Sequence, residues 1–170
     1  MKKIILFLLL IFSIWMSAQT TVESVQVADM DEGAPICGKS IDLHKRILQA
    51  YNCDSTLIVF ACDTTKKGKN TDTGNLYSLD ANTLEVQWQK SLKLSLSKLY
   101  GVCSKGVLLS STLKSTGKSL LTLSDAKTSR SLWTQYLYPV YFNDSLDIVV
   151  GLEKVGGSKT YAYRLSTGML

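Results

Sequence analysis

The chain contains Leu76-Tyr77-Ser78-Leu79-Asp80-Ala81-Asn82-Thr83 and, 45 residues later, Leu121-Thr122-Leu123-Ser124-Asp125-Ala126-Lys127-Thr128. The second stretch repeats the leucine, the Asp-Ala pair and the threonine without a gap, and the two stretches run on to Trp88 and Trp133. A third, weaker copy is Tyr161-Ala162-Tyr163-Arg164-Leu165-Ser166-Thr167-Gly168. Repeats of this length indicate stacked supersecondary units, and strand-rich repeats of about 40 to 45 residues are typical of propeller blades.

Each copy has the same order of strand and turn signals. An apolar, β-branched run predicts a largely buried strand at residues 56–61, 107–111 and 147–151. A polar hairpin follows, and an alternating strand then leads to the Asp-Ala-x-Thr turn. The aspartate suits this turn because its side chain accepts bonds from nearby backbone N–H groups. A strand with the tryptophan comes next, and a short segment precedes each apolar run, so each repeat has four predicted strands.

The pattern Leu-Tyr-x-Leu-Asp-Ala-x-Thr with its following tryptophan resembles the repeat of PQQ-like (quinoprotein-type) β-propellers, over residues 45–170. In that family the turn reads Thr-Gly and the tryptophan docks between neighbouring blades. Thr167-Gly168 keeps this dipeptide, whereas the first two copies have Thr83-Leu84 and Thr128-Ser129. The resemblance implies an all-β fold of consecutive four-stranded antiparallel blades in a partial propeller, about two and a half blades with the third repeat incomplete.

The first 18 residues predict a signal peptide. Lys2 and Lys3 precede residues 4–16, which are apolar except for Ser13, and Ser17-Ala18 supplies small residues before a predicted cut at Gln19. An apolar run of this length spans only about 20 Å as a helix, against roughly 30 Å of hydrocarbon. We therefore expect export to the periplasm or the exterior, with no stable membrane insertion after cleavage.

Residues 19–44 do not match the repeat and form a separate N-terminal segment in this prediction. Residues 21–27 alternate between apolar and polar side chains, which predicts a strand that pairs with an outer edge. The acidic stretch 29–33 lacks a later glutamate at calcium-loop spacing, which favours a surface turn over a calcium site.

The charge balance argues against a nucleic-acid partner. Removal of two lysines with the signal peptide lowers the net charge from +5 to +3. The densest basic cluster, Lys66-Lys67-Gly68-Lys69, lies in a polar loop without aromatic neighbours that could stack on a base. We interpret it as a solvated hairpin loop.

Four cysteines, an even number in an exported chain, permit two disulfides in any of three connectivities: Cys37, Cys53, Cys62 and Cys103. Cys53 and Cys103 occupy equivalent repeat positions, so we expect them to lie too far apart to bridge and Cys37 or Cys62 to be the partner in any bond. The spacings and the single histidine, His44, do not fit a zinc site.

No residue is assigned a catalytic, cofactor-binding or metal-binding role. Trp88 and Trp133 recur at one repeat position, which favours packing, and Asp80 and Asp125 are turn residues. The aromatic stretch 133–142 is ordinary for strands, with a sugar-binding surface as the alternative.

The leading functional hypothesis is an exported, non-catalytic binding or scaffold module in the bacterial cell envelope. An incomplete set of blades leaves exposed strand edges, so we expect a protein partner or self-association. The alternative is a fragment of a quinone-cofactor-dependent dehydrogenase. Such enzymes require a closed ring around the cofactor, a metal held by acids and amides, and often adjacent cysteines, and no two cysteines are adjacent here.

Overall fold

The computed structural model describes residues 22–28, 36–65 and 68–170, which form thirteen β-strands and no helix. The expected all-β class is therefore confirmed. The pattern of contacts divides the chain into two compact units, and the boundary in the sequence lies between Leu43 and His44. Within the described part of the chain, no helix has the length and apolar character needed to cross a membrane.

The N-terminal unit contains one antiparallel hairpin, β1 (Val22–Ala28) and β2 (Ile36–Ile41). The strand expected over residues 21–27 is β1, but its partner is β2, so the expected pairing with an outer repeat edge is wrong. The two strands are close in sequence, and pairing between them closes only a short loop. The predicted signal peptide and the acidic stretch 29–33 lie outside the described residues.

The second unit contains three successive antiparallel sheets, in which each strand pairs with the next one along the chain. Sheet 1 consists of β3 (Arg46–Cys53), β4 (Thr56–Thr64), β5 (Asn70–Asp80) and β6 (Val86–Lys93). Sheet 2 consists of β7 (Ser97–Cys103), β8 (Gly106–Thr112), β9 (Ser119–Ser124) and β10 (Ser131–Gln135). Sheet 3 consists of β11 (Tyr138–Asn143), β12 (Ile148–Leu152) and β13 (Thr160–Arg164).

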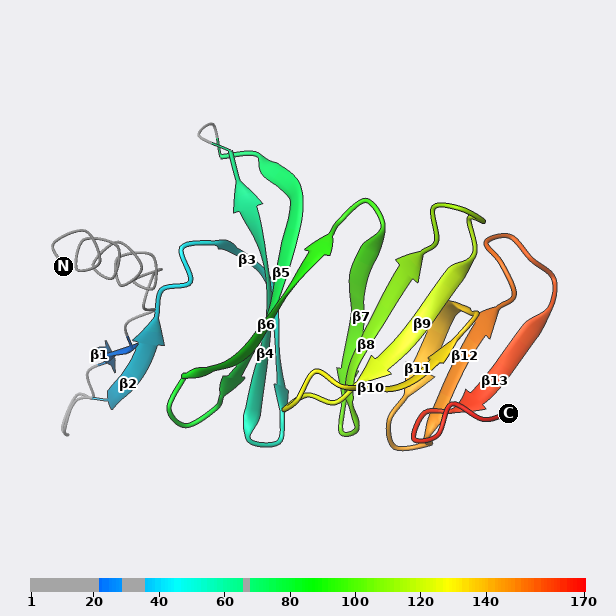
Figure 1. The fold of residues 1–170 in the computed structure, drawn as a ribbon. Helices are drawn as coiled ribbons and strands as arrows, with labels where there is room; N and C mark the ends of the chain where they lie inside the picture. The colour runs from blue at the N-terminus through cyan, green and yellow to red at the C-terminus, as the bar shows by residue number, and fades with distance from the viewer. Residues whose placement is uncertain (1–21, 29–35, 66–67) are drawn as a thin grey trace, which may run out of the picture. The chain divides into compact units, whose positions relative to one another are not determined.

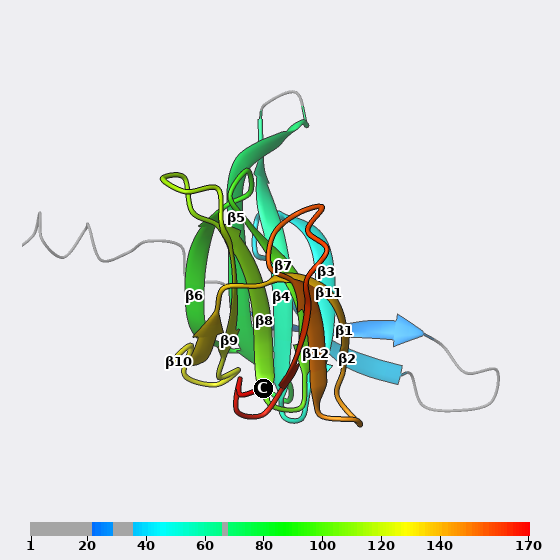
Figure 2. The same cartoon turned by 90° about the vertical axis from the view of Figure 1, so that its right-hand side faces the viewer.

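These sheets confirm the expected four-stranded antiparallel units for the first two repeats. They stand in a row in chain order (Figure 1), and a view along that row shows them one behind another (Figure 2). Among the described residues they do not close into a ring.

Sheets 1 and 2 follow the same register, which defines equivalent positions in the two. Phe60 pairs with Leu76 in sheet 1, and Ser110 pairs with Leu121 in sheet 2. Tight turns after Cys53 and Cys103 start β4 and β8 at equivalent places. Each position of β4 therefore has its counterpart 50 residues later in β8.

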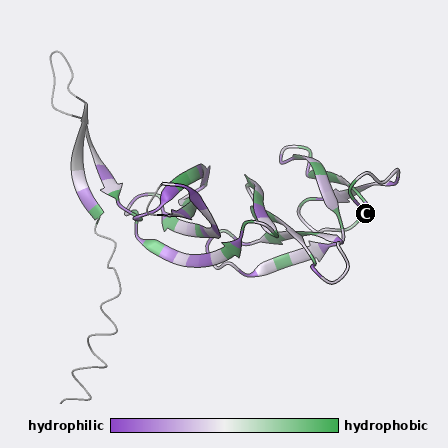
Figure 3. Ribbon diagram, turned by 90° about the horizontal axis from the view of Figure 1, so that it is seen from above, coloured by the Kyte–Doolittle hydropathy of each residue, from purple (hydrophilic) through white to green (hydrophobic). Residues whose placement is uncertain are grey.

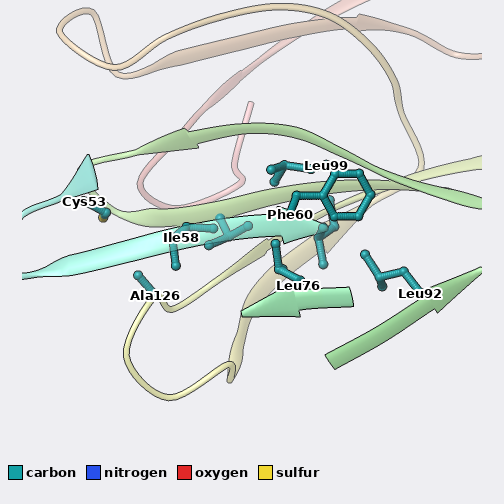
Figure 4. Close-up of a cluster of buried hydrophobic side chains, with 9 residues drawn as sticks. Cys53, Ile58, Phe60, Leu76, Leu92, Leu99 and Ala126 are labelled. Carbon is teal, nitrogen blue, oxygen red and sulfur yellow. The ribbon is translucent and has the colours of Figure 1, made fainter. Parts of the chain in front are cut away.

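Two hydrophobic cores fill the spaces between the sheets. The first joins sheet 1 to sheet 2 through side chains such as Ile58, Phe60 and Leu109, and Figure 4 shows Phe60 beside Leu99 in this core. The second joins sheet 2 to sheet 3 through Leu108 and its neighbours. Figure 3 shows hydrophobic and hydrophilic stretches along the strands, and β4 is a nearly continuous apolar run that is buried over most of its length.

Candidate functional site

A tryptophan on the last strand of sheet 1 and another on the last strand of sheet 2 reach the following sheet. The Trp88 Nε1–H donates to the carbonyl oxygen of Ala126 at 2.8 Å, and the Trp133 Nε1–H donates to that of Leu165 at 2.8 Å. Ser78 Oγ also donates to the Ala126 oxygen, at 2.7 Å. Both rings are half-buried and pack against the hydrophobic cores. We call this arrangement the tryptophan contact.

The turns that accept these contacts are shaped by aspartate side chains. Asp80 Oδ1 accepts hydrogen bonds from the backbone N–H groups of residues 82 and 83, both at 2.9 Å. Asp125 Oδ1 does the same for residues 127 and 128, at 3.0 and 2.7 Å. Hydrogen bonds from the Thr128 hydroxyl and backbone N–H hold the pKa of Asp125 below its ordinary value. The role expected for both aspartates in the turn is confirmed.

The third turn has a different carboxylate. Arg164 takes the position of Asp80 and Asp125, as its backbone bonds to residues 168 and 169 show. Asp147, immediately before β12, instead accepts bonds from the Ser166 N–H and hydroxyl, both at 2.7 Å. A carboxylate from the turn between β11 and β12 therefore compensates for the aspartate missing from the turn after β13.

The residue after the turn threonine has a left-handed backbone in all three copies. Its φ is 61° at Leu84, 61° at Ser129 and 68° at Gly168. Only glycine adopts this conformation without steric cost, which explains the Thr-Gly dipeptide of the third copy. The first two copies impose the same backbone shape on side chains that disfavour it.

The described cysteines are free thiols: Cys53, Cys62 and Cys103. No bond joins Cys53 and Cys103, which agrees with the expectation that they do not pair, but Cys53 Sγ lies 3.1 Å from the carbonyl oxygen of Cys103, so the two residues are closer than expected. The reason is that β3 and β7 contact one another where these cysteines end them. Burial raises the pKa of both thiols, and the sulfur of Cys53 faces a main-chain oxygen. Cys37 has no described side chain.

The other residues marked in the sequence do not converge on one site. His44 and Lys69 are exposed, whereas Lys66 and Lys67 lie outside the described residues. In the aromatic stretch 133–142, Tyr136 is exposed beneath the ammonium of Lys118, 5.5 Å from the ring centre. The described residues contain no group of three or more His, Cys, Asp or Glu side chains placed to hold a metal ion.

Sheet 3 has an edge strand, β13, whose only partner among the described strands is β12. The Arg164 backbone N–H bonds to the carbonyl oxygen of Met169, off the β12 ladder. In an antiparallel pair the backbone groups of alternate residues point inward and outward. The N–H and C=O of Ala162 therefore point to the open edge.

A groove of about 330 Å³ lies beside this edge. Its lining includes Leu146, Ile148, Ala162 and Leu170, and Leu146 and Leu170 are 71% and 80% exposed. Val150 of β12 occupies the position that Ile58 occupies in sheet 1. Ile58 is fully buried, because sheet 2 covers it. No signal in the sequence indicated this groove, although residues 147–151 were expected to form a strand equivalent to those that a further sheet covers in sheets 1 and 2.

Neither the scan against family models nor the search of curated proteins returns a match for this sequence.

Proposed function

We propose that the chain is an exported, non-catalytic protein of PQQ-like β-propeller repeats that acts as a binding or scaffold module in the bacterial cell envelope, periplasmic or secreted. Lys2, Lys3 and the apolar residues 4–16 support export. The tryptophan contact and the aspartate turn, repeated from one sheet to the next, support the propeller-repeat assignment.

The observation that carries the binding role is the open edge of sheet 3. In sheets 1 and 2 the third strand, β5 or β9, is paired with a fourth strand that brings a tryptophan. At β13 the corresponding edge is unpaired among the described strands, and the adjoining groove is lined by apolar side chains together with Asp147 and Arg164. Such an edge accepts an extended segment through main-chain hydrogen bonds, and the groove then selects its side chains.

The segment proposed to occupy this edge is extended, pairs antiparallel with β13 and carries a large apolar or aromatic side chain, as β6 and β10 do beside β5 and β9. This segment continues the arrangement that the first two sheets already show. Lys159 and Arg164 flank the edge, so an acidic residue at either end of the segment favours binding.

The test uses a fluorescent peptide with the sequence of residues 129–136, which spans β10. Fluorescence anisotropy should show binding to the purified protein. Ala162→Pro removes the outward N–H and should weaken binding by about tenfold or more, because proline cannot donate to a ladder. Ala162→Val keeps that N–H and is the matched control.

Equal binding by the wild-type protein and Ala162→Pro, or no binding at all, would contradict the proposed edge. Light scattering on the same samples distinguishes the occupant. A wild-type dimer that Ala162→Pro dissociates would show that a second copy, and not another protein, occupies the edge.

A further inference from the structure

The interface between sheets 2 and 3 contains a second cavity, of about 190 Å³. Its lining includes five side-chain hydroxyl groups that come from sheet 2 and from β11: Ser97, Ser110, Thr112, Ser119 and Tyr138. Apolar groups of Leu94, Leu96 and Val155 complete much of the wall, and Lys98 is the single charged side chain in the lining.

The cavity arises where the repeat departs from its own pattern. Ser110 and Thr112 occupy the positions that Phe60 and Cys62 occupy in sheet 1. Phe60 is 6% exposed and belongs to the first core, so a buried aromatic ring fills this place between sheets 1 and 2, next to the fully buried Cys62. Between sheets 2 and 3 the same place holds short hydroxyl side chains and an open volume.

Two of these hydroxyl groups have no hydrogen-bond partner among the described residues, although Ser110 and Ser119 are only 6% and 5% exposed. Their oxygens stay accessible from the cavity, because the fully buried side-chain atoms without a partner in the described chain are others: Thr56 Oγ1, Asn75 Nδ2 and Ser124 Oγ. Both side chains therefore offer unused donors and acceptors to whatever occupies the cavity.

The lining decides the chemical class of the occupant. The described lining contains no carboxylate, which disfavours a cation, and a single ammonium group gives little support for a dense anion. Hydroxyl groups next to aliphatic groups and a tyrosine ring suit a molecule with hydroxyls on its rim and C–H groups on its faces. The volume lies below the roughly 300–1,000 Å³ of pockets for drug-sized ligands, so the occupant is small.

We propose that this cavity binds one neutral sugar unit, such as the terminal residue of a glycan. The sugar hydroxyls bond to Ser110 and Ser119, and the Tyr138 ring and the aliphatic wall contact its C–H face. This site lies on residues other than those of the open edge, so the two proposals stand or fall separately.

The test measures saturation-transfer NMR and calorimetry on the purified protein with glucose, galactose, mannose and N-acetylglucosamine. At least one sugar should bind. Ser110→Phe restores the side chain of the sheet 1 position, so it should abolish binding while the melting temperature is kept or raised. Ser119→Ala should weaken binding by about fivefold, the usual value of one neutral hydrogen bond. Ser111→Ala, on the opposite face of β8, is the matched control and should bind as wild type.

If Ser110→Phe fails to fold, Ser119→Ala decides the question alone. Binding of none of the four sugars overturns the proposal, and so does sugar binding that Ser110→Phe and Ser119→Ala leave unchanged. Binding of inorganic phosphate in place of every sugar also overturns it, because Lys98 would then define an anion site.

Discussion

Two interfaces, between sheets 1 and 2 and between sheets 2 and 3, share the tryptophan contact. They differ in the side chains that pack beside it. In both, an indole N–H donates to a turn carbonyl of the next sheet at 2.8 Å. Away from that contact, the first interface is filled by Phe60, and the second has Ser110 and Thr112 beside a cavity. The comparison shows that the tryptophan contact is common to both interfaces, whereas the side chains that fill the rest of each interface differ.

The largest effect is expected from making the first interface resemble the second. Phe60→Ser should lower the free energy of unfolding by about 4 kcal/mol, because it removes a buried ring and leaves a cavity. Urea unfolding followed by tryptophan fluorescence measures the change. Ile47→Ser, at a side chain that is 57% exposed in the same sheet, should change it by less than about 0.5 kcal/mol. A loss below about 1 kcal/mol for Phe60→Ser would show that this interface is not tightly packed.

The two tryptophan contacts differ in whether the acceptor oxygen keeps another hydrogen-bond donor when the indole N–H is removed. Trp88→Phe leaves the Ala126 oxygen bonded to Ser78, whereas the described residues offer the Leu165 oxygen no second side-chain donor after Trp133→Phe. An unpaired buried acceptor costs about 1–3 kcal/mol. Trp133→Phe should therefore cost about 2 kcal/mol and Trp88→Phe about 1 kcal/mol.

Chemical denaturation of the two tryptophan variants, of Ser78→Ala and of the double variant Ser78→Ala/Trp88→Phe measures this difference. The double variant should lose more than the sum of its single changes, because it removes both donors to one oxygen. Equal costs for the two single tryptophan variants would contradict this account of the contacts.

The left-handed turn positions allow a gain in stability. Leu84→Gly and Ser129→Gly should each raise the free energy of unfolding by about 1 kcal/mol, since glycine adopts positive φ without steric cost. Differential scanning calorimetry measures the shift in melting temperature. Gly168→Ala is the reverse control and should destabilise, because its Cβ would lie 2.7 Å from the Trp133 ring. Destabilisation by both glycine variants would show that the native side chains make compensating contacts.

The smallest expected effect is on the loss of stability at low pH. Asp125 has a folded-state pKa below its ordinary value of 3.8, so its contribution is present above that value and is lost as the pH falls through the folded-state pKa. Asp125→Asn should flatten the decline of the melting temperature between about pH 4 and pH 2. Asp147 retains its own acid dependence in that variant, because its pKa is also lowered, first by the Ser166 hydroxyl. An unchanged acid limb in Asp125→Asn would contradict the role of this carboxylate.

Local signals in the sequence predicted the strands and turns because each depends on neighbouring residues. Thr56–Thr64 is the apolar β4, and Asp80 and Asp125 shape the turns, as their short side chains favour. The pairing of β1 with β2 was predicted wrongly, and the close approach of Cys53 to the Cys103 carbonyl was not expected, although the two cysteines do not pair. Both depend on which strands converge in space, and a repeat offset does not contain that information.

Neither the groove at sheet 3 nor the hydroxyl-lined cavity was found from the sequence. Serine and threonine are common in strands, so Ser110 and Thr112 carry no functional signal by themselves. A signal was nevertheless present in the offset of 50 residues, because it aligns Ser110 with Phe60 at the same repeat position. Comparison of inward-facing positions between repeats would have located the cavity, but only once the register fixed which face of β8 points to sheet 3.

The direction of the tryptophan contact has a consequence for biosynthesis. Trp88 bonds to a carbonyl 38 residues further along the chain, and Trp133 to one 32 residues further along. A growing chain therefore always has a most recent sheet whose tryptophan has not yet met its acceptor. Each sheet completes its packing only when the next turn has been synthesised, so folding should advance from the N-terminus one sheet behind synthesis.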